Sequence, residues 1–114
     1  YHYIRAEDVV KPLGIAGLPL GLTLPADTKV PFGCTRVTMS TGDVLVLTSD
    51  GVEEALNGSE EFYEAERLSS LIGELGRKGT SADTMRDGIT EDVKAFIGDA
   101  AQSDDITVVV AKAT

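Results

Sequence analysis

Residues 44–51 read VLVLTSDG, and this stretch decides the fold because an unbroken apolar run ends on an aspartate and a glycine. Residues 103–110 read SDDITVVV and hold the reverse arrangement, in which two aspartates precede an apolar run. Both runs have the length and the β-branched content of strands. If they pair antiparallel, the end of the first strand lies about 4.8 Å from the start of the second. Asp50 then meets Asp104 and Asp105 at one edge of a sheet.

Carboxylates that converge in this way repel one another unless a cation lies between them. Strand pairing would also bury Asp104 and Asp105, and an unpaired buried carboxylate is costly. Hard divalent ions such as Mg²⁺ and Mn²⁺ prefer oxygen ligands of this kind. The aspartates therefore predict half of a metal site. Two simpler explanations stay open: Asp50 caps the following helix through backbone N–H groups, and residues 103–105 form a polar turn that leads into a strand.

Few other side chains offer chemistry. His2 is the only histidine and Cys34 the only cysteine, which argues against a zinc site, a Ser-His-Asp triad and a thiol nucleophile. We expect His2 to be a bystander in a strand and Cys34 to be a small apolar filler or a loop residue. A single cysteine forms no internal disulfide, and this fits a reducing, cytoplasmic setting.

The composition of the chain argues against some classes of binding partner. The chain has 114 residues, of which 42% are hydrophobic and 25% charged, as in ordinary globular domains. Nineteen acidic residues against ten basic ones give a net charge of −9. This charge argues against binding to nucleic acid or to an anionic membrane surface. No apolar run approaches the roughly 20 residues of a membrane span.

Hydrophobic periodicity predicts strands, then helices, then one returning strand. Short strands are expected at Tyr1–Tyr3 and Val9–Val10, and a closing strand at 106–111. A hairpin is expected between residues 36–39 and a central strand at 44–47, which should be covered on both faces. The expected helices are 51–56, 64–75 with Gly76 as its cap, and one from a Thr80–Asp83 capping box to Ile97. This order predicts an α+β fold in which a pair of helices covers one face of an antiparallel sheet.

The stretch from Pro12 to Pro31 is rich in glycine and proline and predicts an irregular connection. Residues 17–21 read GLPLG, with no Lys-Ser/Thr after them as a phosphate-binding loop would have. We expect this loop to lie against the sheet through Leu18 and Leu20.

Four segments carry a family resemblance in their order and spacing. They are GLPLG at 17–21, GDVLVLTSDGVEEA at 42–55, FYEAERL at 62–68 and QSDDITVVV at 102–110. Together they resemble the metal-dependent Ser/Thr protein phosphatases (PPM family), in the bacterial branch typified by the sporulation and stress-response phosphatases (SpoIIE-like).

The resemblance implies an α-β-β-α sandwich that binds two Mn²⁺ or Mg²⁺ ions. By position, Asp50 and Asp104 would be metal ligands, Asp105 an auxiliary acid, and Gly51 the residue that allows the tight turn after the ligand. In such enzymes a metal-bound water attacks phosphorus in line. By family analogy the substrate would be a bacterial phosphoprotein with a regulatory role, and an anti-anti-sigma factor is the first expectation.

The resemblance covers only one half of a phosphatase domain. The chain opens on Tyr1-His2-Tyr3 inside a strand pattern, without methionine, and the family's upstream Asp-Gly pair and "NAGH"-like strand are missing. We therefore expect residues 1–114 to be the C-terminal portion of one domain, which a sensor domain could precede. Alone, this portion should bind metal poorly and not hydrolyse phosphoesters. The alternatives are a phosphatase-like binding module without metals and a plain α+β domain.

Overall fold

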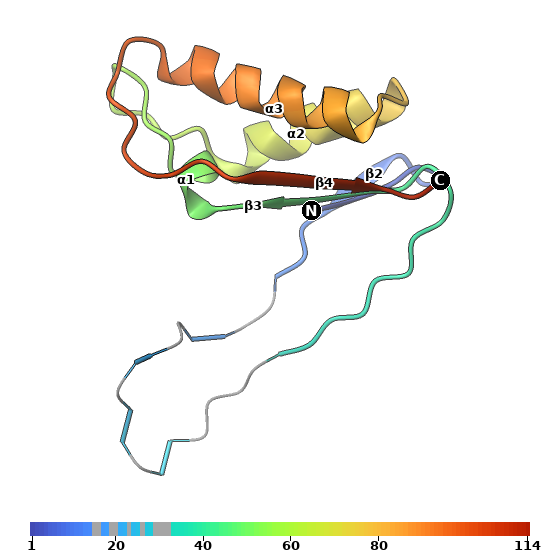
Figure 1. Cartoon of the computed structure of the whole chain (residues 1–114), viewed down its shortest axis with the longest axis horizontal. Helices are drawn as coiled ribbons and strands as arrows, with labels where there is room; N and C mark the ends of the chain where they lie inside the picture. Colours follow the sequence, from blue (N-terminus) through green and yellow to red (C-terminus); the bar gives the residue numbers. More distant parts are fainter. Residues whose placement is uncertain (15–16, 19–20, 23, 26, 29–32) are drawn as a thin grey trace.

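Among the described residues, four strands form one antiparallel sheet, and two longer helices lie together on one of its faces (Figure 1). The computed structural model describes residues 1–14, 17–18, 21–22, 24–25, 27–28 and 33–114. The strands are β1 (His2–Ile4), β2 (Val9–Lys11), β3 (Val44–Thr48) and β4 (Val108–Lys112), in the sheet order β2-β1-β3-β4. The helices are α1 (Asp50–Glu53), α2 (Ala65–Arg77) and α3 (Ala82–Ile97). The predicted α+β class and helix-covered antiparallel sheet are confirmed.

Strand β3 is central, as predicted, because it pairs with β1 on one side and β4 on the other. The pairing of β3 with β4 is antiparallel and runs from Val44↔Lys112 to Thr48↔Val108. Strand β4 begins two residues later than the sequence predicts. The reason is that α1 carries the chain away directly after β3, so that Ile106 has no partner strand.

The core lies between the sheet and the helices. Alternate residues of the strands face α2 and α3, as the two-residue period of a strand requires. The sheet and both helices contribute fully buried side chains, among them Tyr3, Val44 and Val46 from the sheet, Leu68 and Ile72 from α2, and Met85, Ile89 and Val93 from α3. Both helices are therefore amphipathic, and among the described residues no helix is both long and apolar enough to cross a membrane.

Gly76 does not cap α2, as the sequence suggested, but lies within the helix. A Cβ atom at this position would approach the ring of Tyr3 to 2.6 Å. The glycine therefore serves close packing of α2 against β1. The helix continues to Arg77, and the positive φ of 68° that ends the turn belongs to Gly79.

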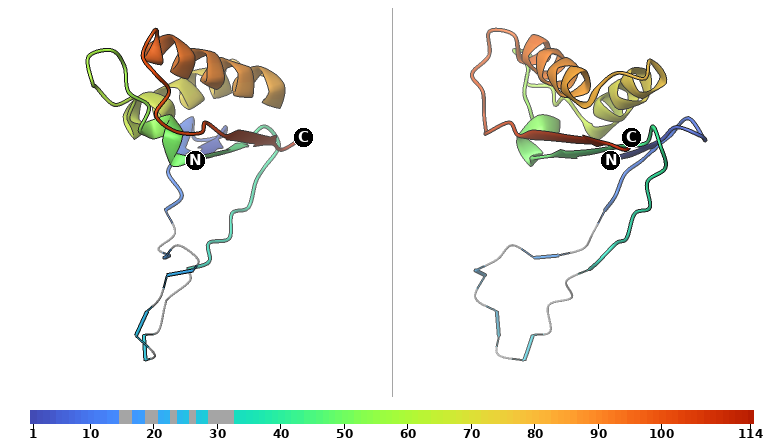
Figure 2. Two further views of the ribbon diagram at one scale, coloured as in Figure 1. Left: turned by 60° about the vertical axis from the view of Figure 1, so that its left-hand side comes forward. Right: turned by 45° about the vertical axis from the view of Figure 1, so that its right-hand side comes forward.

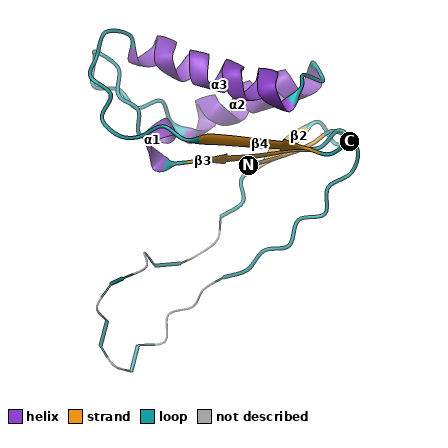
Figure 3. Ribbon diagram, viewed as in Figure 1, coloured by secondary structure: helices purple, strands orange, loops and turns teal. Residues whose placement is uncertain are grey.

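The opposite face of the sheet is exposed. Leu47 and Val109 pair across β3 and β4, and each keeps 53% of its surface accessible. The prediction that both faces of β3 are covered is therefore wrong for this chain, because α2 and α3 both lie on the other side of the sheet (Figure 3). A cavity of about 750 Å³ opens on the exposed side, where Leu13 and Val37 of the long connection approach Leu45 and Leu47.

Residues 36–39 form no strand, which corrects the predicted hairpin. The described residues that follow β2 and those that lead into β3 extend on the side of the sheet away from the helices (Figure 2). Leu18 is 42% exposed, so the prediction that it holds the loop against the sheet is also wrong. Leu18 lies between Gly17 and Pro19 in the sequence, and both of these residue types are unfavourable inside a strand that could carry apolar side chains to the sheet. Leu20 lies outside the described residues.

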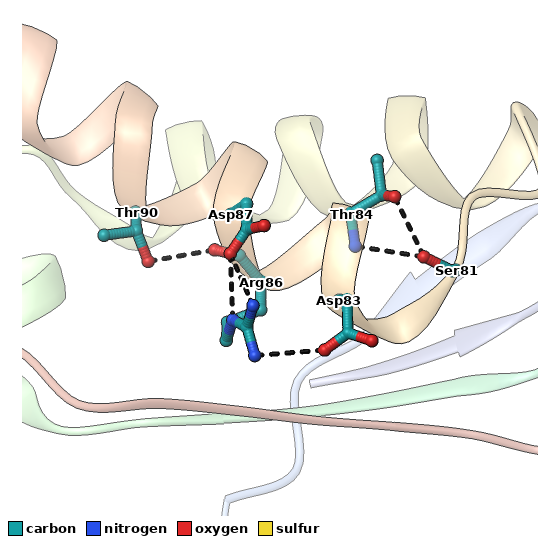
Figure 4. Close-up of polar contacts among 6 residues, drawn as sticks. All are labelled: Ser81, Asp83, Thr84, Arg86, Asp87 and Thr90. Atoms are coloured by element: carbon teal, nitrogen blue, oxygen red, sulfur yellow. Dashed lines mark hydrogen bonds and ion pairs between the residues drawn. The ribbon is translucent and has the colours of Figure 1, made fainter.

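Helix α3 begins after Ser81, not at a capping box built on Thr80. The Ser81 Oγ accepts a hydrogen bond of 3.1 Å from the backbone N–H of Thr84, next to the ion pairs of Arg86 (Figure 4). The Thr80 hydroxyl instead donates to the carbonyl of Leu75, 3.1 Å away, in the turn that follows α2. The predicted cap is thus displaced by one residue.

Replacing Ser81 by alanine should lower the free energy of unfolding by about 1 kcal/mol, the usual cost of losing an N-cap side chain. Denaturant unfolding followed by circular dichroism measures this change. Ser70→Ala is the matched control, because the Ser70 hydroxyl only donates to the carbonyl of Glu66 within α2. Equal stability losses for the two variants would contradict the cap assignment.

Candidate metal centre

Asp50 is the first residue of α1 and follows β3 after a single residue. Its side chain is exposed, and its Oδ1 accepts a hydrogen bond of 2.9 Å from the N–H of Gly51. The N-cap of α1 is Ser49, whose side chain makes no capping hydrogen bond. Asp50 therefore does not act as the helix cap that the simpler explanation required. Within the described ranges, this is the one hydrogen bond of its carboxylate, and it leaves Oδ2 open.

Gly51 lies where the two acidic segments meet. These segments are residues 49–51, which include Asp50, and residues 103–105, which include Asp104 and Asp105. A Cβ atom at Gly51 would collide with the carbonyl oxygen of Asp105 and would lie 3.1 Å from the carbonyl carbon of Asp105 and 3.4 Å from the Cβ of Asp104. Asp104 thus lies beside the residue that follows Asp50. The sequence predicted that these distant segments meet at one edge of the sheet, and the contacts of Gly51 confirm that they do. This edge, with Asp50, Asp104 and Asp105, is called the acidic rim below. Whether these aspartates are metal ligands stays a prediction.

Strand pairing does not bury the adjacent aspartates, which corrects the argument from burial. Asp104 and Asp105 are both exposed, because they lie in a turn before β4 begins at Val108. In this turn the Asp104 Oδ1 accepts a hydrogen bond of 2.7 Å from the N–H of Asp105, and the Gln102 Nε2 donates to the Asp104 carbonyl over 2.7 Å. Water can therefore solvate these charges, and a cation is not required to stabilise them.

The donor set nevertheless fits a hard cation. Asp50, Asp104 and Asp105 offer only carboxylate oxygens, which suit Mg²⁺ and Mn²⁺ better than softer metals. Within the described part of the chain none of them forms an ion pair, whereas aspartates elsewhere pair with arginine, as Asp92 does with Arg67 at 3.0 Å. No group of three or more acidic, histidine or cysteine side chains that could hold a metal exists among the described residues.

The remaining sequence candidates lie away from the rim. His2 in β1 is buried, with its Nε2 3.5 Å from a carboxylate oxygen of Asp43. Cys34 is exposed in the connection before β3, so it is a loop residue and not an apolar filler. Among the described residues, neither belongs to a group of three or more side chains that could hold a metal ion. The expectation that His2 is a bystander stays a prediction.

Asp43, the acid of the Gly42-Asp43 motif, has a structural role. Its buried carboxylate accepts hydrogen bonds from the backbone N–H groups of Ser40, at 2.8 Å, and Arg5, at 2.9 Å. These two N–H groups, with the neighbouring His2, hold the pKa of Asp43 below its ordinary value. The motif residue therefore fixes the turn into β3 and does not belong to the candidate metal centre.

Residues 62–68 also hold the fold together. The guanidinium of Arg67 lies 5.0 Å from the ring centroids of both Tyr63 and Phe96. The Tyr63 hydroxyl donates to Asp92 over 2.6 Å, and burial together with this bond raises the pKa of Tyr63. This cluster joins the connection between α1 and α2 to α3.

Sequence reasoning missed Ser49. Its Oγ donates to the carbonyl of Asp105 over 2.8 Å and accepts from the N–H of Thr107 at 3.0 Å. The available signal was a hydroxyl residue directly before Asp50, but its partner could be known only from the register of β3 and β4.

The solved structure of the SiaA-PP2C domain of Pseudomonas aeruginosa has a similar fold. The TM-score is 0.59, the identity is 18%, and the match covers 67% of this chain and 30% of that one. The chain thus spans about a third of the length of the domain that it matches. A comparison with curated protein sequences gave no match.

The family described as stage II sporulation protein E (SpoIIE) matches residues 1–114, which is the whole chain. This match agrees with the phosphatase-like fold and with the segments of sequence that carried the resemblance. The chain therefore belongs to the SpoIIE family of PPM-type phosphatase domains.

Proposed function

We propose that residues 1–114 are the C-terminal part of a phosphoserine/phosphothreonine protein phosphatase domain that depends on Mn²⁺ or Mg²⁺. In this proposal Asp50 and Asp104 are metal ligands and Asp105 is an auxiliary acid. The supporting observation is the contact of Gly51 with Asp104 and Asp105, which places the acidic ends of two distant segments side by side. Membership of the SpoIIE family supports the reaction class.

Each residue of the rim has a distinct task in this proposal. The metal ions, when bound, would lower the pKa of a coordinated water and offset the charge of the phosphate. Asp50 and Asp104 present carboxylates without ion-pair partners in the described residues. Gly51 has no side chain, so the main chain of Asp105 can approach α1 closely. The exposed carboxylate of Asp105 is free to orient water beside the ions.

The proposal assigns the rest of the site to a further part of the domain. The described residues hold no cluster of three metal-binding side chains, and the chain covers 30% of the SiaA-PP2C domain. We propose that an upstream Asp-Gly pair completes the coordination of two ions. The proposed substrate is a phosphorylated bacterial regulatory protein, such as an anti-anti-sigma factor. A net charge of −9 would repel the phosphate group of such a substrate, and bound metal ions would offset this repulsion.

The complete domain should release phosphate from a phosphoserine peptide only when Mn²⁺ or Mg²⁺ is present. EDTA should abolish the release, and excess Mn²⁺ should restore it. Residues 1–114 alone should show no turnover under the same conditions, because they supply only part of the coordination sphere. Metal-independent hydrolysis by the complete domain would contradict the proposal. Hydrolysis by residues 1–114 at a comparable rate would contradict the division of the site.

A non-catalytic, phosphatase-like binding module is the second candidate. The observation that favours it is the lack of a three-ligand cluster among the described residues. The two candidates differ in the sequence upstream of Tyr1, since a module without metals has no need of the Asp-Gly pair. A domain that captures the phosphoprotein but neither binds Mn²⁺ nor releases phosphate would support the module.

A further inference from the structure

Ser49 connects the two acidic segments beyond the point where the sheet ends. The last ladder pair of β3 and β4 is Thr48↔Val108. Past this pair, the N–H of Ser49 donates to the Thr107 carbonyl over 3.1 Å. Its hydroxyl then accepts from the Thr107 N–H at 3.0 Å and donates to the Asp105 carbonyl over 2.8 Å. The side chain thus takes the place of a ladder partner where the strands have separated.

The Asp105 carbonyl that Ser49 holds is also the group that lies against Gly51. The position of this carbonyl therefore sets the approach of residues 104–105 to the start of α1. Gln102 bonds the Asp104 carbonyl, but it belongs to the same turn and does not reach α1. Among the described residues, all side-chain hydrogen bonds between the two acidic segments come from Ser49.

We propose that Ser49 is a positioning residue that fixes the distance between the carboxylates of Asp50 and Asp104 before metal binds. This inference rests on the proposed metal-dependent function. Ser49 is not a ligand in this proposal, because its hydroxyl already donates to the carbonyl of Asp105 and accepts from the N–H of Thr107. Groups that orient metal ligands typically change metal affinity or activity about 10-fold to 100-fold when they are removed.

The test uses the complete domain with Ser49→Ala, Ser49→Thr and the control Ser70→Ala, which removes an exposed hydroxyl bonded only to the carbonyl of Glu66. Calorimetry should show Mn²⁺ binding weakened about 10-fold to 100-fold in Ser49→Ala. Ser49→Thr keeps the hydroxyl and should bind Mn²⁺ as the wild type does. Hydrogen exchange without metal should be faster at the Thr107 amide in Ser49→Ala alone.

Equal Mn²⁺ affinity in the wild type and Ser49→Ala would overturn the positioning role and leave the proposed function intact. A wild type that binds no Mn²⁺ would overturn the proposed function and this inference with it. If Ser49→Ala does not fold, Ser49→Cys serves instead, because a thiol fills the same space but bonds weakly. A soft thiolate is also a poor ligand for Mn²⁺ and so would not create a new site.

Discussion

Replacing Asp50 or Asp104 by asparagine is expected to lower kcat/KM of the complete domain by at least about a thousandfold. The substitution keeps the shape of the side chain and removes the charge that would hold a divalent ion. Charge stabilisation by metal ions is worth several kcal/mol in the transition state, and each 1.36 kcal/mol changes the rate tenfold. Steady-state assays on a phosphoserine peptide measure the loss, and calorimetry with Mn²⁺ measures the accompanying loss of binding.

Asp99→Asn is the control for these variants, because Asp99 is also exposed and forms no ion pair in the described residues. It should retain full activity and full Mn²⁺ binding. Asparagine is as good a helix cap as aspartate, so a cap role for Asp50 would leave Asp50→Asn unchanged in every assay. Activity above a tenth of the wild-type value in Asp50→Asn would remove Asp50 from the metal centre.

The sequence predicts the order of the elements well and their ends less well. The apolar run that becomes β3 and the helical spacing of Met85, Ile89 and Val93 depend on burial, which governs the whole element. Where a helix or strand ends depends instead on single contacts with residues that are distant in the sequence. Gly76 resembles a helix cap in sequence, but the ring of Tyr3 from a distant strand explains its presence. The strand expected at 36–39 has suitable residues but no partner in the sheet.

The candidate metal centre was likewise predictable from the sequence only in part. Antiparallel pairing of two apolar runs was enough to place Asp50 near Asp104, because the direction of the strands fixes which ends meet. The exposure of Asp104 and Asp105 was not predictable, since it depends on where the ladder ends. The ladder stops at Thr48↔Val108, and three residues then separate Asp104 from β4. The role of Ser49 follows from this same register.

The exposed face of the sheet is where the second sheet of the proposed complete domain would pack. Leu47 and Val109 are neighbours on this face, each with 53% of its surface accessible, and Leu45 lies on the same face of β3. Paired apolar side chains on an exposed sheet are typical of a surface that another element covers. In the proposed α-β-β-α sandwich, the second sheet packs here, about 10 Å from the first. Leu47 would then be part of the central core of the complete domain.

Leu47→Lys should therefore change the stability of residues 1–114 much less than that of the complete domain. In residues 1–114 alone the lysine remains in water, and the free energy of unfolding should change by less than about 0.5 kcal/mol. In the complete domain the substitution would bury an unpaired charge between two sheets and should cost about 3 kcal/mol or more. Denaturant unfolding of both forms measures the difference.

Leu22→Lys is the control, because Leu22 has the same exposed fraction of 53% in the long connection. If Leu47→Lys were as mild in the complete domain as in residues 1–114, the second sheet could not lie on this face.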